Sequence, residues 1–243
     1  MKPLPSVSLQ GRTVLVTGAS RGIGAAVARR LAFAGARVAL LARDKEALGA
    51  LAREIGRGAV ALACDLRDTE TLKRAIDQLP SLMGGVPDIV VNNAGAFFLT
   101  PAGETSVEAF SETLATNLTA PFAVVRALLD AFRARGSGHV VTIGSIADRT
   151  TFAGNAAYAA SKHGLRALHE VLREELRGSG VRVSLVSPGP VNTDLWNTVN
   201  PDEHPGVTPH ASMLTADAVA DAVHYVVTAP LALNVDELRL SRS

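Results

Sequence analysis

Short apolar runs alternate with longer helical stretches along most of the chain, and this alternation is the feature that most limits its fold. Six runs are predicted to be strands: TVLVT (13–17), ARVALLA (36–42), AVALAC (59–64), DIVV (88–91), HVVTIG (139–144) and VRVSLVS (181–187). Continuously apolar strands separated by helices are typical of a parallel sheet covered on both faces. We therefore expect an α/β protein with a single doubly wound Rossmann fold, with helices on both faces of a mostly parallel sheet. The expected sheet has seven strands, of which the seventh is not located in the sequence.

Helices are predicted between these runs. They are expected from the glycine-rich turn to about Ala34, over 44–55, around 68–79, from about 105 to about Arg135, and from Asn155 to about Arg177. Residues 190–214 are polar, contain several prolines and lose the periodicity. A connection of that length in a compact domain is typical of a functional lid or of a disordered segment. We expect residues 1–243 to form one domain with a substrate lid around 190–214.

The composition limits the classes of function. The net charge is +1 and no block of like charges occurs, so nothing indicates a nucleic-acid or membrane partner. No apolar run is long enough for a membrane span or a signal peptide. The single cysteine, Cys64, fits a reducing cytoplasm, and the six histidines have no metal-ligand spacing. We expect a cytoplasmic protein that acts on a small molecule without a metal.

The stretch TGASRGIG (17–24) lies between the first predicted strand and the first predicted helix, where a phosphate-binding turn would lie. Glycines let the backbone approach a pyrophosphate, and the N-terminus of a helix presents unpaired N–H groups. No G-K-[ST] follows the glycines, which disfavours a Walker-type ATP or GTP site. The alternative is a turn that only joins strand to helix.

The end of the second predicted strand bears on the choice of coenzyme. A dinucleotide fold that prefers NAD places an acid there to bind the ribose 2′-hydroxyl, but this chain has Ala42 followed by Arg43. Arg21 in the glycine turn is expected to face the same ribose edge, and two guanidinium groups could bind a 2′-phosphate. Asp44, which would repel a phosphate, is interpreted as a helix N-cap. We predict NADP(H) as the preferred coenzyme, with NAD(H) possible; the alternative is two ordinary surface arginines.

The stretch NAAYAASKHGL (155–165) holds one of the two tyrosines of the chain, Tyr158, and a lysine four residues later, Lys162. The two side chains share a helix face. A neighbouring ammonium favours phenolate, so we expect Lys162 to lower the pKa of Tyr158 toward working pH. Ser145 lies at the end of a predicted strand, where a serine can be only a turn residue. Ser161, which lies between Tyr158 and Lys162, is interpreted as a bystander that takes no part in this chemistry.

Asn117 is followed four residues later by Pro121, which has no backbone N–H. In a helix, the carbonyl of Asn117 would then lack its donor and could accept a hydrogen bond from water. The alternative is a proline kink that affects packing only.

Together these motifs resemble the short-chain dehydrogenase/reductase family, in the branch of about this chain length. TGASRGIG, NNAG (92–95), PGPVNT (188–193) and the Ser145, Tyr158 and Lys162 spacing occur in the family's order. The resemblance implies a nicotinamide-dependent oxidoreductase that interconverts a ketone or aldehyde and an alcohol by hydride transfer, with Tyr158 as acid and base. It also implies a homotetramer or homodimer.

The resemblance implies roles for individual residues as well. The catalytic set would be Asn117, Ser145, Tyr158 and Lys162, with Asn117 in a water relay to Lys162. The coenzyme contacts would be Gly18, Ser20, Arg21, Gly22, Ile23, Gly24, Arg43, Asp65, Leu66, Asn93, Ala94, Gly95, Tyr158, Lys162, Pro188, Gly189, Val191 and Thr193. Asp65 and Leu66 would contact adenine and Thr193 the nicotinamide amide, although Asp65 could be a strand-end cap and Thr193 an ordinary loop residue.

Four aromatic residues, Phe97, Phe98, Phe152 and Trp196, are candidates for an apolar substrate pocket, or else for core. The C-terminal sequence NVDELRLSRS lacks the glycine-rich tail of reductases that act on 3-oxoacyl groups bound to acyl carrier protein. Such a reductase and a hydroxy-acid dehydrogenase remain alternative functions. A non-enzymatic NADP-sensing protein is the alternative from another class, and the complete catalytic set disfavours it.

Overall fold

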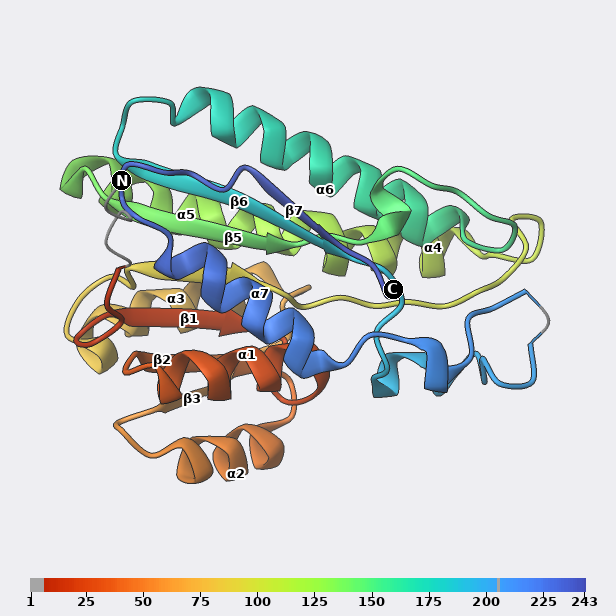
Figure 1. The fold of residues 1–243 in the computed structure, drawn as a ribbon, viewed down its shortest axis with the longest axis horizontal. Coiled ribbons are helices and arrows are strands. Elements are labelled where there is room, and N and C mark those ends of the chain that lie inside the picture. Colours follow the sequence, from red (N-terminus) through yellow and green to blue (C-terminus); the bar gives the residue numbers. More distant parts are fainter. Residues whose placement is uncertain (1–6, 205) are drawn as a thin grey trace.

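The computed structural model describes residues 7–204 and 206–243. Its seven-stranded sheet has the order β3-β2-β1-β4-β5-β6-β7, and all neighbouring strands are parallel (Figure 1). The strands are β1 (Thr13–Thr17), β2 (Arg37–Ala42), β3 (Val60–Ala63), β4 (Ile89–Asn92), β5 (Gly138–Ile143), β6 (Val181–Pro188) and β7 (Glu237–Leu240). The predicted doubly wound fold is confirmed.

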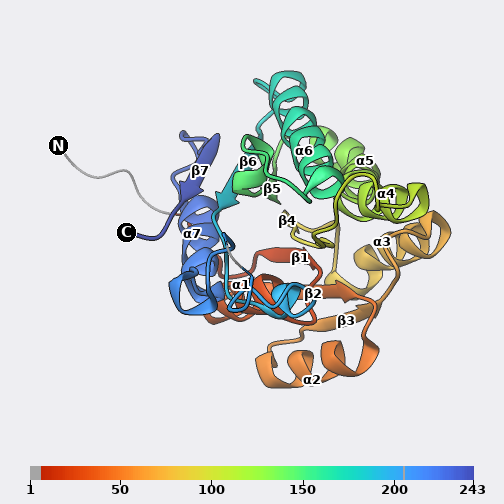
Figure 2. The same ribbon diagram turned by 90° about the vertical axis from the view of Figure 1, so that its right-hand side faces the viewer.

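Helices cover both faces of the sheet (Figure 2). One face carries α1 (Gly22–Phe33), α2 (Lys45–Ile55) and α7 (Ala216–Thr228), and the other carries α3 (Thr69–Met83), α4 (Val107–Leu114), α5 (Ala120–Arg135) and α6 (Ala156–Glu175). Side chains of β1 face the two helix layers alternately, because successive residues of a strand point to opposite faces of the sheet. Val14 and Val16 pack with α1, and Leu15 packs with the opposite layer.

The structure differs from the predicted elements in three places. Helix α3 continues through Pro80 to Met83 instead of ending near residue 79. The proline removes one helical hydrogen bond and crowds the preceding turn, but the apolar face of the helix continues to the buried Met83. Helix α7 and strand β7 were not located from the sequence. A five-residue π-helix, η1 (Ala115–Thr119), joins α4 to α5, so the long predicted helix is continuous but changes its winding.

The strand order reverses between β1 and β4, and ligands of open α/β sheets bind at the carboxyl ends of strands beside such a reversal. The segment 190–214 leaves this edge after β6 and contains two short 3-10 helices, Asp194–Trp196 and His210–Ser212. Its two ends are joined by backbone hydrogen bonds between Asn192 and Leu214 and between Leu214 and Pro190. Figure 1 shows the segment projecting beside the carboxyl ends of the strands. Within the described part of the chain, no helix has the length and apolar character needed to cross a bilayer.

Candidate active site

A cavity of about 800 Å³ opens at the carboxyl ends of the strands. It brings together the glycine turn, the ends of β2, β3 and β5, the loops after β4 and β6, and the start of α6. All the residues predicted for catalysis, coenzyme or substrate line this cavity except Gly24 and Asn117. Gly24 and Asn117 are both buried, and neither lines the cavity.

The glycines of the β1–α1 turn are required by close backbone packing. Gly18 and Gly22 have φ angles of +64° and +55°, which side chains disfavour. A Cβ on Gly24 would lie 2.2 Å from the carbonyl oxygen of Gly18, so α1 could not begin so close to β1 with any other residue. Asn93 fixes the turn from the β4 side, because its amide donates to the carbonyls of Thr17 and Gly18 at 3.0 and 3.2 Å.

Helix α1 begins without a side-chain cap. Its N-cap residue, Arg21, makes no capping hydrogen bond, so the first N–H groups of the helix face the cavity without a side-chain acceptor. Thr193 of the 190–214 segment lies against this turn, with its Cγ2 3.3 Å from the position a Cβ on Gly22 would take. The turn therefore fits the pyrophosphate of a dinucleotide.

At the end of β2, Ala42 is buried and Arg43 is exposed on the rim of the cavity. Asp44 caps α2 as predicted, since its carboxylate accepts from the backbone N–H of Ala47 at 2.9 Å. The carboxylate of Asp44 is thus used by the helix, and the two arginines predicted for the ribose phosphate, Arg43 and Arg21, both line the cavity.

At the β3 end, Asp65 is paired with a side chain that the sequence analysis did not identify. Arg67 donates to its carboxylate at 2.7 Å and also pairs with Glu112 of α4 at 3.3 Å. The hydrogen bonds from Arg67 lower the pKa of Asp65 to about 2. Asp65 also accepts from the backbone N–H of Arg67, so it does act as a strand-end turn residue, beside any contact with adenine.

Lys162 lies in the floor of the site and is only 4% exposed. Its ammonium donates to the carbonyl of Ile143, the last residue of β5, at 3.0 Å. Burial lowers the pKa of Lys162 to about 8, and the carboxylate of Asp148 opposes this shift. The ammonium group is therefore held at the carboxyl end of β5, and its pKa of about 8 lies close to neutral pH.

The expected lowering of the pKa of Tyr158 is not found. Burial raises the pKa of this phenol, with a smaller opposing effect from the neighbouring Ser145 hydroxyl and a further rise from Asp148. The ammonium of Lys162 lies 5.7 Å from the centre of the tyrosine ring and is directed to the carbonyl of Ile143 instead. At neutral pH the phenol is therefore protonated, which is the form that can donate a proton.

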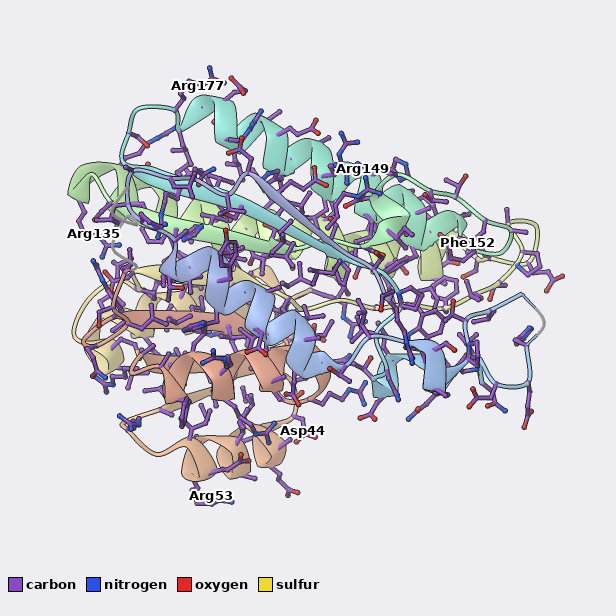
Figure 3. The ribbon with its side chains drawn as sticks, viewed as in Figure 1. Asp44, Arg53, Arg135, Arg149, Phe152 and Arg177 are labelled. Atoms are coloured by element: carbon purple, nitrogen blue, oxygen red, sulfur yellow. The ribbon has the colours of Figure 1, made fainter. Side chains whose placement is uncertain are left out.

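Asp148 is a functional candidate that the sequence analysis missed. It is 1% exposed and accepts from the hydroxyl of Ser187 at 2.6 Å and from Arg149 at 3.0 Å. Arg149, labelled in Figure 3, also pairs with Glu237 of β7 at 2.6 Å. This chain of contacts joins the loop after β5 to β6 and β7. A carboxylate three residues after Ser145 in the same strand-end loop was the signal available in the sequence.

Asn117 and Ser161 are linked, so Ser161 is not the bystander that the sequence suggested. The Asn117 amide donates to the Ser161 hydroxyl at 3.0 Å, and that hydroxyl donates to the carbonyl of Tyr158 at 2.7 Å. Asn117 also exchanges two hydrogen bonds with the backbone of Ala96, at 2.7 and 2.9 Å. Both side chains are fully buried, and Asn117 lies in the π-helix before Pro121. The pair ties α6 and the loop after β4 together behind the cavity.

Aromatic side chains line the side of the cavity beyond the tyrosine. The ring of Phe97 packs edge-on against Tyr158 and against Trp196, with centroids 4.8 Å apart in both pairs. Phe98 and Phe152 also line the cavity, and Phe152 is 47% exposed. Figure 3 shows Phe152 at the end of the molecule that carries the 190–214 segment.

An open parallel sheet with a glycine turn between its first strand and first helix is characteristic of dinucleotide-binding proteins. A family model described as short chain dehydrogenase matches residues 12–204. The chain belongs to the short chain dehydrogenase family.

Individual relatives agree with this assignment over nearly their whole length. A D-threitol dehydrogenase from Mycolicibacterium smegmatis is 36% identical over 90% of this chain and 87% of its own, and an NADP-dependent 3-hydroxy acid dehydrogenase from Salmonella typhi is 34% identical over 93% of each. The crystal structure of a metagenomic short-chain oxidoreductase in complex with NADP superimposes with a TM-score of 0.83, at 36% identity, over 98% of this chain and 99% of that one.

The Asp148 contacts generate a stability prediction. Asp148→Ala should lower the free energy of unfolding by about 2 kcal/mol or more, because it leaves the buried Ser187 hydroxyl unpaired and removes one partner of Arg149. Glu237→Gln, the control, breaks only the more exposed pair to Arg149 and should cost less than about 1 kcal/mol. Urea unfolding of both variants measures the difference, and equal costs would show that the buried carboxylate is not the stabilising member.

Proposed function

We propose that the protein is an NADPH-dependent oxidoreductase that interconverts a ketone or aldehyde and the corresponding alcohol. The observation that carries this proposal is that Tyr158, Ser145 and Lys162 face the same cavity as the glycine turn. A dinucleotide extended from that turn along the carboxyl ends of the strands would bring its nicotinamide end to Tyr158. The bound coenzyme supplies or accepts the hydride.

In the reductive direction, Tyr158 donates its phenolic proton to the carbonyl oxygen as the carbonyl carbon is reduced. The raised pKa keeps this proton in place at neutral pH until the oxygen becomes basic. The Ser145 hydroxyl hydrogen-bonds the same oxygen and stabilises its developing charge. In the oxidative direction the phenolate accepts the proton from the alcohol.

Lys162 would hold the ribose hydroxyls of the nicotinamide half and provide a positive charge beneath the phenolate. Asn117 would continue the proton path toward solvent through its backbone carbonyl. Pro121, four residues later, has no N–H to donate to this carbonyl, so a water molecule could do so. Its side chain is fully used in holding Ala96 and Ser161. That use leaves the carbonyl, and not the amide, as the group for the relay.

The preference for NADPH over NADH rests on Arg21 and Arg43. Both line the cavity, and the acid at the end of β2 is committed to capping α2. Two guanidinium groups beside one 2′-phosphate favour the phosphorylated coenzyme. A relative whose printed name is NADP-dependent, and the solved structure in complex with NADP, support the same choice.

We further propose a homodimer or homotetramer in the cytoplasm. Val107, Phe122 and Val171 expose apolar surface on α4, α5 and α6, which supports association of copies through these helices. The single cysteine, Cys64, is buried and agrees with a reducing compartment.

Replacing Tyr158 by Phe tests the proposed acid. Removal of the phenolic proton should lower kcat for ketone reduction by about 100-fold or more, while NADPH affinity changes little because the ring and its packing remain. Initial rates with a panel of ketones, together with calorimetric titration of NADPH, measure the two effects separately. Unchanged turnover in the variant would contradict the assignment of Tyr158.

Replacing Arg43 by Ala tests the coenzyme preference. The variant should lose roughly 10- to 100-fold in affinity for NADPH and almost none for NADH, because one charge-assisted hydrogen bond to the 2′-phosphate is lost. Arg53→Ala is the matched control, since Arg53 is an exposed arginine on α2 that does not line the cavity (Figure 3). Equal losses for both coenzymes, or a native protein that uses NADH as well as NADPH, would refute the preference.

A further inference from the structure

The cavity is divided by charge. Six charged side chains line the part formed by the glycine turn, the ends of β2 and β3, and α4: Arg21, Arg43, Asp44, Asp65, Arg67 and Glu112. Beyond Tyr158 the lining side chains are almost all apolar. The charged residues thus lie where the adenosine half of a dinucleotide would bind, and the other part is left for the substrate.

The substrate part is built from three separate segments. Phe97 and Phe98 come from the loop after β4, Ile146 and Phe152 from the segment between β5 and α6, and Leu195 and Trp196 from the 190–214 segment. Ile146 and Phe152 are 45% and 47% exposed although they border a cavity. Large apolar side chains left in contact with water at a concave site favour an apolar ligand that removes this surface from water.

Fixed positive charge is scarce around these aromatic side chains. Lys162 is the one cationic group among the described lining residues on this side, and its ammonium lies in the floor, bound to the carbonyl of Ile143. The nearby Arg149 is engaged by Asp148 and Glu237 and does not line the cavity. A carboxylate on the substrate would find no free guanidinium or ammonium group among these residues.

One negative charge is present instead. Asp194, an exposed residue directly before Leu195 and Trp196, also lines the cavity. A substrate carboxylate would be transferred from water to an apolar wall without a counter-ion and beside a like charge, and both effects are unfavourable. A neutral molecule would bear neither cost.

We propose that the substrate is an electrically neutral carbonyl compound, or the corresponding neutral alcohol, with an apolar aryl or alkyl substituent, and that the site rejects carboxylates. This inference rests on the proposed oxidoreductase function and adds the substrate class. It separates the chain from its relative named for 3-hydroxy acids, which are carboxylates at neutral pH. The selecting elements are the aromatic wall and Asp194.

A matched pair of probes tests the substrate class: benzoylformate, which is an anion, and its methyl ester, which keeps the same phenyl ketone without the charge. With NADPH, kcat/KM for the ester should exceed that for the anion by at least about tenfold. Only the anion has a carboxylate that must lose its hydration and bind beside Asp194. Equal or higher kcat/KM for the anion would overturn the inference.

Binding can be followed without turnover, because Trp196 is the single tryptophan of the chain and packs against Phe97 in the cavity wall. Titration of its fluorescence in the protein with NADP+ should give tighter binding of the ester than of the anion. If the ester binds more tightly but neither probe is reduced, the proposed function fails while the substrate class stands. Binding of the anion as tightly as the ester would overturn the substrate class whatever the turnover.

A charge reversal gives the sharpest contrast. Asp194→Lys should raise kcat/KM for benzoylformate relative to the ester by at least about tenfold, because the new ammonium supplies the missing counter-ion. Glu203→Lys makes the same change of charge at an exposed position of the same segment that does not line the cavity, and should leave the ratio unchanged. Equal effects of the two substitutions would show that only the overall charge of the segment matters, and would refute the role of Asp194.

Discussion

A buried ammonium group is the constraint on which the rest of the active site depends. Lys162 is almost inaccessible to water, and a charge removed from water is unstable unless protein groups replace the hydration. The carbonyl of Ile143 provides one hydrogen bond, and the buried carboxylate of Asp148 provides a compensating charge. The carbonyl of Ile143 and the carboxylate of Asp148 must therefore both lie near the ammonium group, at the end of β5. The loop that follows this strand also carries Ser145.

The same requirement explains the polar contacts behind the cavity. Asp148 is itself a buried charge, and Ser187 on β6 and Arg149 satisfy it. Gly144 has no side chain because a Cβ there would lie 2.5 Å from the hydroxyl of Ser187. From the other side, Asn117 holds α6 through the Ser161 hydroxyl. Helix α6, which carries the tyrosine and the lysine, is thus fixed to strands β5 and β6 and to the π-helix before α5.

The fold and most of the site could be predicted from the sequence, because apolar strands, the glycine turn and the tyrosine–lysine spacing are local patterns. Contacts between distant segments could not be predicted. Asp148 and Ser187 are 39 residues apart in the sequence, and Asn117 and Ser161 are 44 apart. The sequence around one residue of such a pair gives no indication of its partner. The pKa of Tyr158 was wrongly predicted for a related reason: helical spacing fixes its distance from Lys162 but not the desolvation by surrounding segments, which dominates.

The pH dependence of ketone reduction tests the central claim most directly, that a charged Lys162 supports proton donation by Tyr158. The pKa of Lys162 is about 8 and that of Tyr158 is raised, so the lysine loses its proton first as the pH increases. We predict that kcat/KM with NADPH is constant at neutral pH and falls about tenfold per unit above about pH 8. A value of kcat/KM that stays constant to about two units above that pH would contradict the account.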